Sequence, residues 1–158
     1  MGAVKNMLKG FIYTAIYAFF SIGIPLITFS SIRNMVVAGF PLEFEQQDYE
    51  NVIFWLIAFG LIISGCAFFK YSSPKQSIRK GIFALIQVLV NCLYLWSYKF
   101  SGATEIKFVM NFGFFSLNLE QMILVYMGIY FLTIILRIYD VIDFSINREK
   151  IRENRMKA

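Results

Sequence analysis

Four long stretches without a charged residue constrain this chain more than any other feature of its sequence. They lie at 11–31, 51–69, 81–98 and 121–136. The fourth is the shortest, and its helix extends to about 119–142 if Arg137 snorkels to the membrane surface. A helix needs about 20 apolar residues to cross the hydrocarbon core, and a lipid-exposed backbone must satisfy its own hydrogen bonds. The sequence therefore predicts an all-α integral membrane protein with four transmembrane helices at about these positions.

The composition agrees with residence in a bilayer. Hydrophobic residues make up 58% of the 158 positions and charged residues only 16%, with a mean hydropathy of +0.62. A soluble domain of this size could not bury so much apolar surface. We expect a single membrane domain over 1–158, which ends in a basic, helical cytoplasmic tail at 143–158.

The residues needed for most catalytic chemistry are missing. The chain has no histidine, and its two cysteines, Cys66 and Cys92, lie within apolar runs without a CxxC spacing. No charged residue stands in the middle of a run, where proton pumps and ion-coupled transporters carry them. We therefore expect no catalytic, cofactor-binding or metal-binding residue, and a protein that is not an enzyme.

The distribution of basic residues predicts how the chain crosses the membrane. All but three of the 15 lysines and arginines lie before the first run, between the second and third, or at and after the end of the fourth. By the positive-inside rule, both termini are cytoplasmic in a multi-pass protein of the plasma (inner) membrane. The net charge of +5 then reflects topology and attraction to anionic lipid, and no nucleic-acid-binding motif accompanies it.

The two connections expected on the outer side have some pattern of their own. Residues 40–49 mix aromatic and acidic side chains, and residues 105–119 alternate weakly around Gly113. This alternation is compatible with a short β-hairpin that turns at the glycine. The two connections could form a small outer cap, or they could be loops in the lipid headgroups with their phenylalanines dipping inward.

A polar seam runs along the third predicted helix. It consists of Ala84, Gln87, Asn91, Tyr94 and Tyr98, spaced three and four residues apart as in the contact face of a left-handed helix pair. Amides facing lipid would remain unpaired, so the seam should face protein or water. Two interpretations stay open: hydrogen bonds to a neighbouring helix, or a water- or ion-filled axis lined by several copies of the chain.

Two further features suggest contacts with partners. Gly60 and Ser64 form a small-xxx-small face that permits close helix approach, within the chain or between copies. The tail carries a set of cations that could bind a cytosolic protein and anionic lipid, or could be a solvated end that fixes topology. These cations are Arg148, Lys150, Arg152, Arg155 and Lys157.

These observations favour a non-catalytic, homo-oligomeric membrane subunit that anchors or signals to a cytosolic partner, as a sensor or scaffold. The alternative is an ion channel or pore lined by the polar seam. In topology alone, the chain resembles the small four-helix membrane subunits of bacterial two-component assemblies, such as the membrane component of the Kiwa anti-phage system. That resemblance implies a role in a defence-type assembly with a cytosolic partner.

Overall fold

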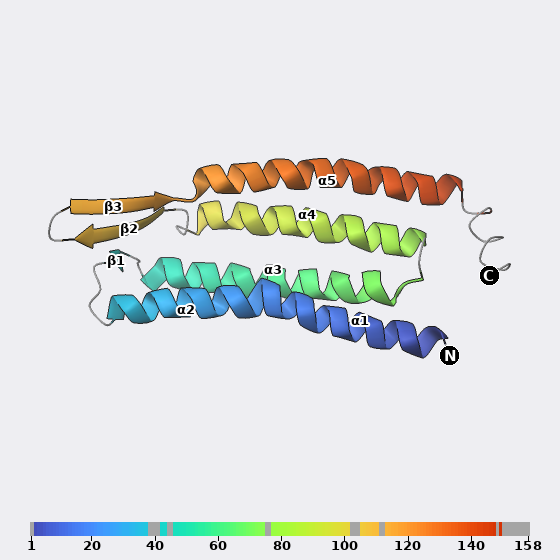
Figure 1. Ribbon diagram of the computed structural model, residues 1–158, viewed down its shortest axis with the longest axis horizontal. Coiled ribbons are helices and arrows are strands. Elements are labelled where there is room, and N and C mark those ends of the chain that lie inside the picture. Colours follow the sequence, from blue (N-terminus) through green and yellow to red (C-terminus); the bar gives the residue numbers. More distant parts are fainter. Residues whose placement is uncertain are drawn as a thin grey trace.

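Four long helices and a small sheet make up the computed structural model (Figure 1). The structure describes residues 2–37, 42–43, 46–74, 77–101, 105–110, 113–147 and 149. The first long helix is continuous from α1 (Gly2–Ala18) through the π-helical segment η1 (Phe19–Gly23) to α2 (Ile24–Val37). The others are α3 (Gln46–Ser72), α4 (Ile78–Phe100) and α5 (Glu120–Ile146).

All four helices are long and apolar enough to cross a membrane. Each extends beyond the charge-free run from which it was predicted, except that α5 starts one residue later than expected. The extension has a simple cause, since a charged side chain near the end of a membrane helix can reach the surface without ending the helix. At the start of α4, Ser77 accepts a hydrogen bond from the Lys80 N–H at 3.2 Å, which caps the helix.

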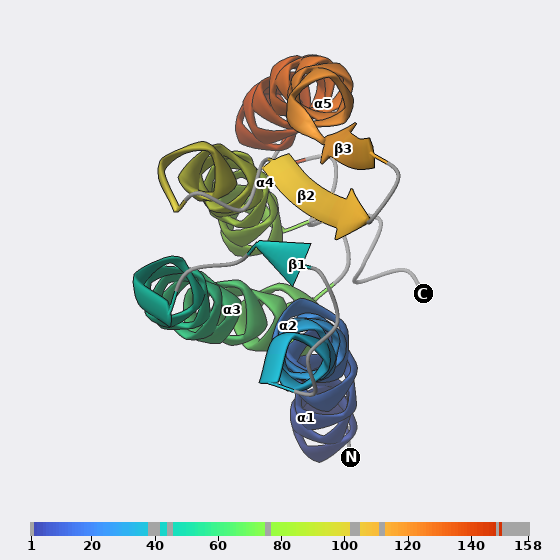
Figure 2. The same ribbon diagram turned by 90° about the vertical axis from the view of Figure 1, so that its left-hand side faces the viewer.

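The helices lie in a curved row rather than a closed bundle. Contacts join α1 with α3, α3 with α4, and α4 with α5, and Figure 2 shows the four in an arc seen end-on. The inner members α3 and α4 supply the buried core, which includes Val52, Leu56 and Ile63. No residue of α5 is buried, and large apolar side chains such as Leu124 and Leu132 are exposed on it, as expected for a helix that faces lipid.

The first long helix changes direction at η1, where Figure 1 shows α1 and α2 meeting at an angle. Pro25 follows directly, and proline has no N–H to donate to the carbonyl four residues before it. The Ile24 N–H bonds to the Phe19 carbonyl, the i to i−5 pattern of a π-turn. The sequence alone predicts a kink at Pro25; the structure adds the widened turn that precedes it.

A three-stranded antiparallel sheet lies at the end of the row opposite the start of α1 and the end of α5 (Figure 1). Its strands are β1 (Leu42–Glu43), β2 (Glu105–Met110) and β3 (Gly113–Asn118), in that order. Glu105 pairs with Asn118 and Met110 with Gly113, while Leu42 pairs with Phe108. The connections between the first and second, and the third and fourth, long helices are thus joined by backbone pairing.

Candidate functional site: the basic end of the helix row

The buried end of the polar seam is paired within the chain. The Lys70 Nζ of α3 donates a hydrogen bond to Gln87 Oε1 of α4 at 3.0 Å. Gln87 is only 2% exposed, and its Nε2 has no hydrogen-bond partner. Ala84 is also buried, whereas Asn91 is half-buried. One of the two amides therefore bridges α3 and α4, and its partner is a cation.

The two seam tyrosines reach across to the first long helix. The Tyr94 hydroxyl donates to the Ser21 carbonyl at 3.3 Å and shares a 2.7 Å hydrogen bond with the Tyr98 hydroxyl. A phenol has one proton, so when Tyr94 donates it to Ser21, Tyr98 must be the donor to Tyr94. The Tyr98 ring stacks near Phe29 of α2, with centroids 6.1 Å apart. Together with the Lys70 hydrogen bond, the seam thus joins α4 to two other long helices of the same chain.

The small-residue face of α3 lies against the π-turn. A Cβ placed on Gly60 would collide with the Ile22 side chain and lie 3.3 Å from the Ser21 carbonyl oxygen. Ser64 is buried and donates its hydroxyl to the Gly60 carbonyl at 2.7 Å, inside its own helix. Gly60 and Ser64 therefore pack within the chain in this structure. The tail cations predicted to contact a partner, Arg148, Lys150, Arg152, Arg155 and Lys157, lie outside the described residues.

Cations gather at the end of the row where α1 begins and α5 ends. Among the described residues they are Lys5, Lys9, Lys70, Arg79, Lys80 and Arg137. Two adjoining cavities open there, and both are lined by Lys70 and Lys80.

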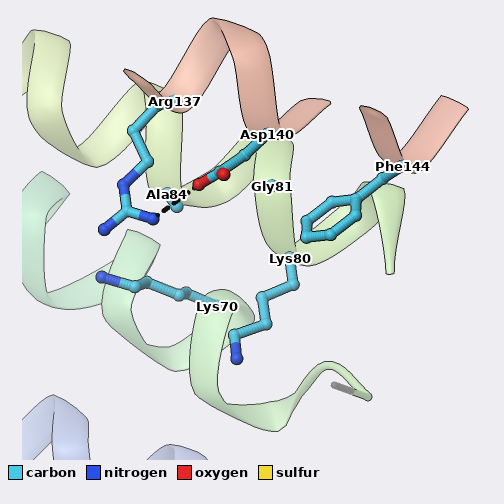
Figure 3. Close-up of a pocket in the computed structure, with 7 residues that line it drawn as sticks. All are labelled: Lys70, Lys80, Gly81, Ala84, Arg137, Asp140 and Phe144. Carbon is cyan, nitrogen blue, oxygen red and sulfur yellow. Dashed lines mark hydrogen bonds and ion pairs between the residues drawn. The ribbon is translucent and has the colours of Figure 1, made fainter. Parts of the chain in front are cut away.

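The first cavity has a volume of about 300 Å³ and lies between α3, α4 and α5 (Figure 3). Arg137 pairs with Asp140 one turn later, with 2.9 Å between Nη1 and Oδ2. The Arg137 Nε is buried without a hydrogen-bond partner. Figure 3 shows the head groups of Arg137 and Lys70 on the same side of the cavity, with the Phe144 ring on the other.

The helices approach closely around this cavity because its wall contains a glycine. A Cβ on Gly81 would lie 3.0 Å from Val141 Cγ2 and 3.3 Å from the ring of Phe144. Such distances are tighter than ordinary van der Waals contact, so a larger residue would push α4 away from α5. Gly81 thus sets the spacing that encloses the cations.

The second cavity, of about 320 Å³, lies between α1, the end of α3 and the start of α4. Three lysines line it with Asn6, Tyr71, Ser73 and Pro74, and none of these described lining residues is a carboxylate. Stacked tyrosines hold two of the lysines in place. The rings of Tyr13 and Tyr71 lie 3.8 Å apart at 7°, with Lys9 over the first at 5.8 Å and Lys70 over the second at 5.1 Å.

This basic end was not predicted as a site from the sequence, where Lys70 and Lys80 served only as topology signals. The available signal was the short break at Ser73-Pro74. In an antiparallel helix pair, residues equally far from the turn face each other. Lys70 stands two residues before the end of α3 and Lys80 two residues after the start of α4, so a turn centred just after Pro74 would have brought them together.

The described hydroxyl groups show no sign of nucleophile activation. Ser21 donates to the Tyr17 carbonyl at 2.6 Å and Thr28 to the Ile24 carbonyl at 3.0 Å, each one turn back in its own helix. In the described part of the chain, no group of three His, Cys, Asp or Glu side chains could hold a metal ion.

No protein-family model, curated protein or solved structure matches this chain. Its architecture of four apolar helices fits a multi-pass membrane protein.

Proposed function

We propose that this chain is a non-catalytic, homo-oligomeric membrane subunit that anchors or signals to a cytosolic partner at its basic end. The proposal rests on the difference between the two ends of the helix row. The start of α1, the end of α5, the α3–α4 turn and most described cations lie at one end, and the sheet lies at the other (Figure 1). With the basic end in the cytoplasm of a plasma (inner) membrane, the arrangement obeys the positive-inside rule.

The pairing of charges at the two ends supports this orientation. At the sheet end, Lys99 pairs with Glu120 at 2.9 Å, and the Arg33 guanidinium lies 4.7 Å from the centre of the Tyr49 ring. At the basic end, of the cations only Arg137 forms an ion pair among the described residues. The cytoplasmic face would therefore present unneutralised positive charge, which attracts anionic lipid and acidic protein surfaces.

Self-association belongs to the same proposal and rests on the open arc. The two flanks, α1–α2 and α5, expose apolar side chains along their lengths, so copies can pack side by side in the bilayer. The pore alternative requires the seam of several copies to meet around one axis. The seam contacts made by Gln87, Tyr94 and Tyr98 within one chain favour the packing role instead.

Orientation and anchoring are tested separately. For orientation, single cysteines replace exposed Pro74 at the basic end and exposed Asn118 at the sheet end, in a chain whose native Cys66 and Cys92 are serines. A membrane-impermeant maleimide added to intact cells should label Asn118→Cys and leave Pro74→Cys unlabelled. The opposite labelling pattern would overturn the proposed topology.

Anchoring is tested with a tail deletion from Arg148 to Ala158. The deleted chain should insert and label as the full chain does, but should lose the cytosolic protein that co-purifies with the full chain. A charge-neutral tail of equal length, with glutamine at the five tail cations, separates charge from length. Unchanged co-purification in both variants contradicts a docking role for the tail.

A further inference from the structure

The basic end holds positive charges between its helices, a position that orienting the protein in a membrane does not require. Cations that only orient a membrane protein can lie on the surface, exposed to water and headgroups. Here Lys70 instead turns inward to Gln87, and the Arg137 Nε is buried without a partner. Gathering like charges in a partly enclosed space is unfavourable unless an opposite charge joins them.

The protein itself supplies little of that opposite charge. Among the described residues that line the two cavities, Asp140 is the one carboxylate, and it is already paired with Arg137. Within the described residues, neither ion pair includes Lys9, Lys70 or Lys80. The hydrogen-bond acceptor of Lys70 is the neutral oxygen of Gln87. The described lining of the second cavity therefore has three ammonium groups and no anion.

From this geometry we propose that the cavity lined by Lys9, Lys70 and Lys80 binds a phosphate group. The three lysines come from three different helices, so their donors approach from different directions. This arrangement suits a tetrahedral oxyanion with oxygens on every side; a planar carboxylate is better matched by the two-pronged guanidinium of an arginine. The Asn6 amide, which lines the same cavity, adds a further donor.

The volume of the cavity and its depth in the membrane are compatible with two sources of that phosphate. A volume of about 320 Å³ accommodates a phosphate with a small substituent. In the proposed orientation, the helix ends that form the cavity lie at the depth of the inner-leaflet headgroups, where basic pockets between helices hold anionic lipids. A phospholipid headgroup and a soluble phosphate share this chemistry, and the experiment distinguishes them.

The assay uses the full chain in micelles of a maltoside detergent, which contains no phosphate, and follows its unfolding midpoint. One arm titrates inorganic phosphate against chloride at equal ionic strength; the other adds phosphatidylglycerol to the micelles. We expect a saturable rise of the midpoint in at least one arm. A rise with phosphate indicates a soluble ligand, and a rise with phosphatidylglycerol alone indicates a lipid headgroup. No rise in either arm overturns the proposal.

Three variants test whether the response belongs to this cavity. Lys80→Gln should weaken binding about tenfold, the effect of one lost charge-assisted hydrogen bond. Lys80→Arg should bind with nearly the affinity of the unchanged chain. Lys5→Gln is the matched control, since Lys5 lies one turn from Lys9, is exposed and lines neither cavity. If Lys5→Gln weakens binding as much as Lys80→Gln, the response is general surface attraction and the proposal fails.

Lys80 is the better probe because its side chain makes no hydrogen bond to another described residue, whereas Lys70 also ties α3 to α4. Lys80→Gln should therefore fold as the unchanged chain does. The proposal goes beyond the anchoring function, and its assay needs no partner protein. Loss of phosphate binding and loss of co-purification are thus separate results.

Discussion

The Tyr94 hydroxyl donates to the carbonyl of Ser21, the residue four positions before Pro25. In a regular α-helix, that carbonyl would receive the N–H of residue 25, which proline lacks. The acceptor freed by the proline is therefore met by a side chain from α4, across the helix interface. A backbone irregularity in the first long helix and a polar residue of the third are thus parts of one interaction.

This relationship predicts an energetic coupling between Tyr94 and Pro25. Tyr94→Phe should lower the free energy of unfolding by about 1 kcal/mol, because the Ser21 carbonyl loses its donor. In a Pro25→Ala background, the new N–H of residue 25 can donate to the Ser21 carbonyl. Tyr94→Phe should then lower the free energy of unfolding by clearly less. Unfolding in mixed micelles measures both costs. The lost hydrogen bond to Tyr98 is common to the two backgrounds and cancels.

The contact between Gly60 and Ile22 predicts a steric effect. Gly60→Ala places a methyl group against the Ile22 side chain and near the Ser21 carbonyl, and should destabilise the chain by about 1–3 kcal/mol. Gly65→Ala, on the same helix, is the control because nothing lies within 4 Å of a Cβ there. It should be neutral or slightly stabilising, since alanine is the better helix former. Adding Ile22→Ala should recover part of the loss at Gly60. Equal effects at the two glycines would contradict this account of the packing.

The sequence predicts the helices well, because length and the absence of charge are enough to define a membrane span. It also predicts that Gln87 faces protein or water rather than lipid, because an unpaired amide in lipid is costly. It cannot identify Lys70 as the partner, since a lysine near a helix end can snorkel outward as easily as turn inward. Nor can it predict that β1 pairs with β2, because their residues lie far apart in the chain and neither strand has a strong pattern of its own.

The hydrogen bond between Lys70 and Gln87 predicts that the two residues depend on each other. Lys70→Met removes the donor and leaves Gln87 Oε1 buried without a partner, which should cost about 1–2 kcal/mol of stability. In a Gln87→Leu background, no acceptor is stranded, so the cost of Lys70→Met should be smaller. Asn91→Leu serves as the comparison at a half-buried amide on the same helix face. Additive effects of the Lys70 and Gln87 changes would show that the contact does not hold α3 to α4.

The packing of the seam also predicts the result of a flux measurement. Purified protein in liposomes should pass no saturable ion current over a range of voltages and lipids, because Ala84 and Gln87 are buried between helices of one chain. Gln87→Leu combined with Asn91→Leu should then alter stability or self-association without changing flux. A saturable flux that this double substitution abolishes, with the oligomer intact by cross-linking, would favour the pore instead. In that case the contacts of Gln87 in a single chain would have to open when copies assemble, and the helix row would be the closed state of the channel.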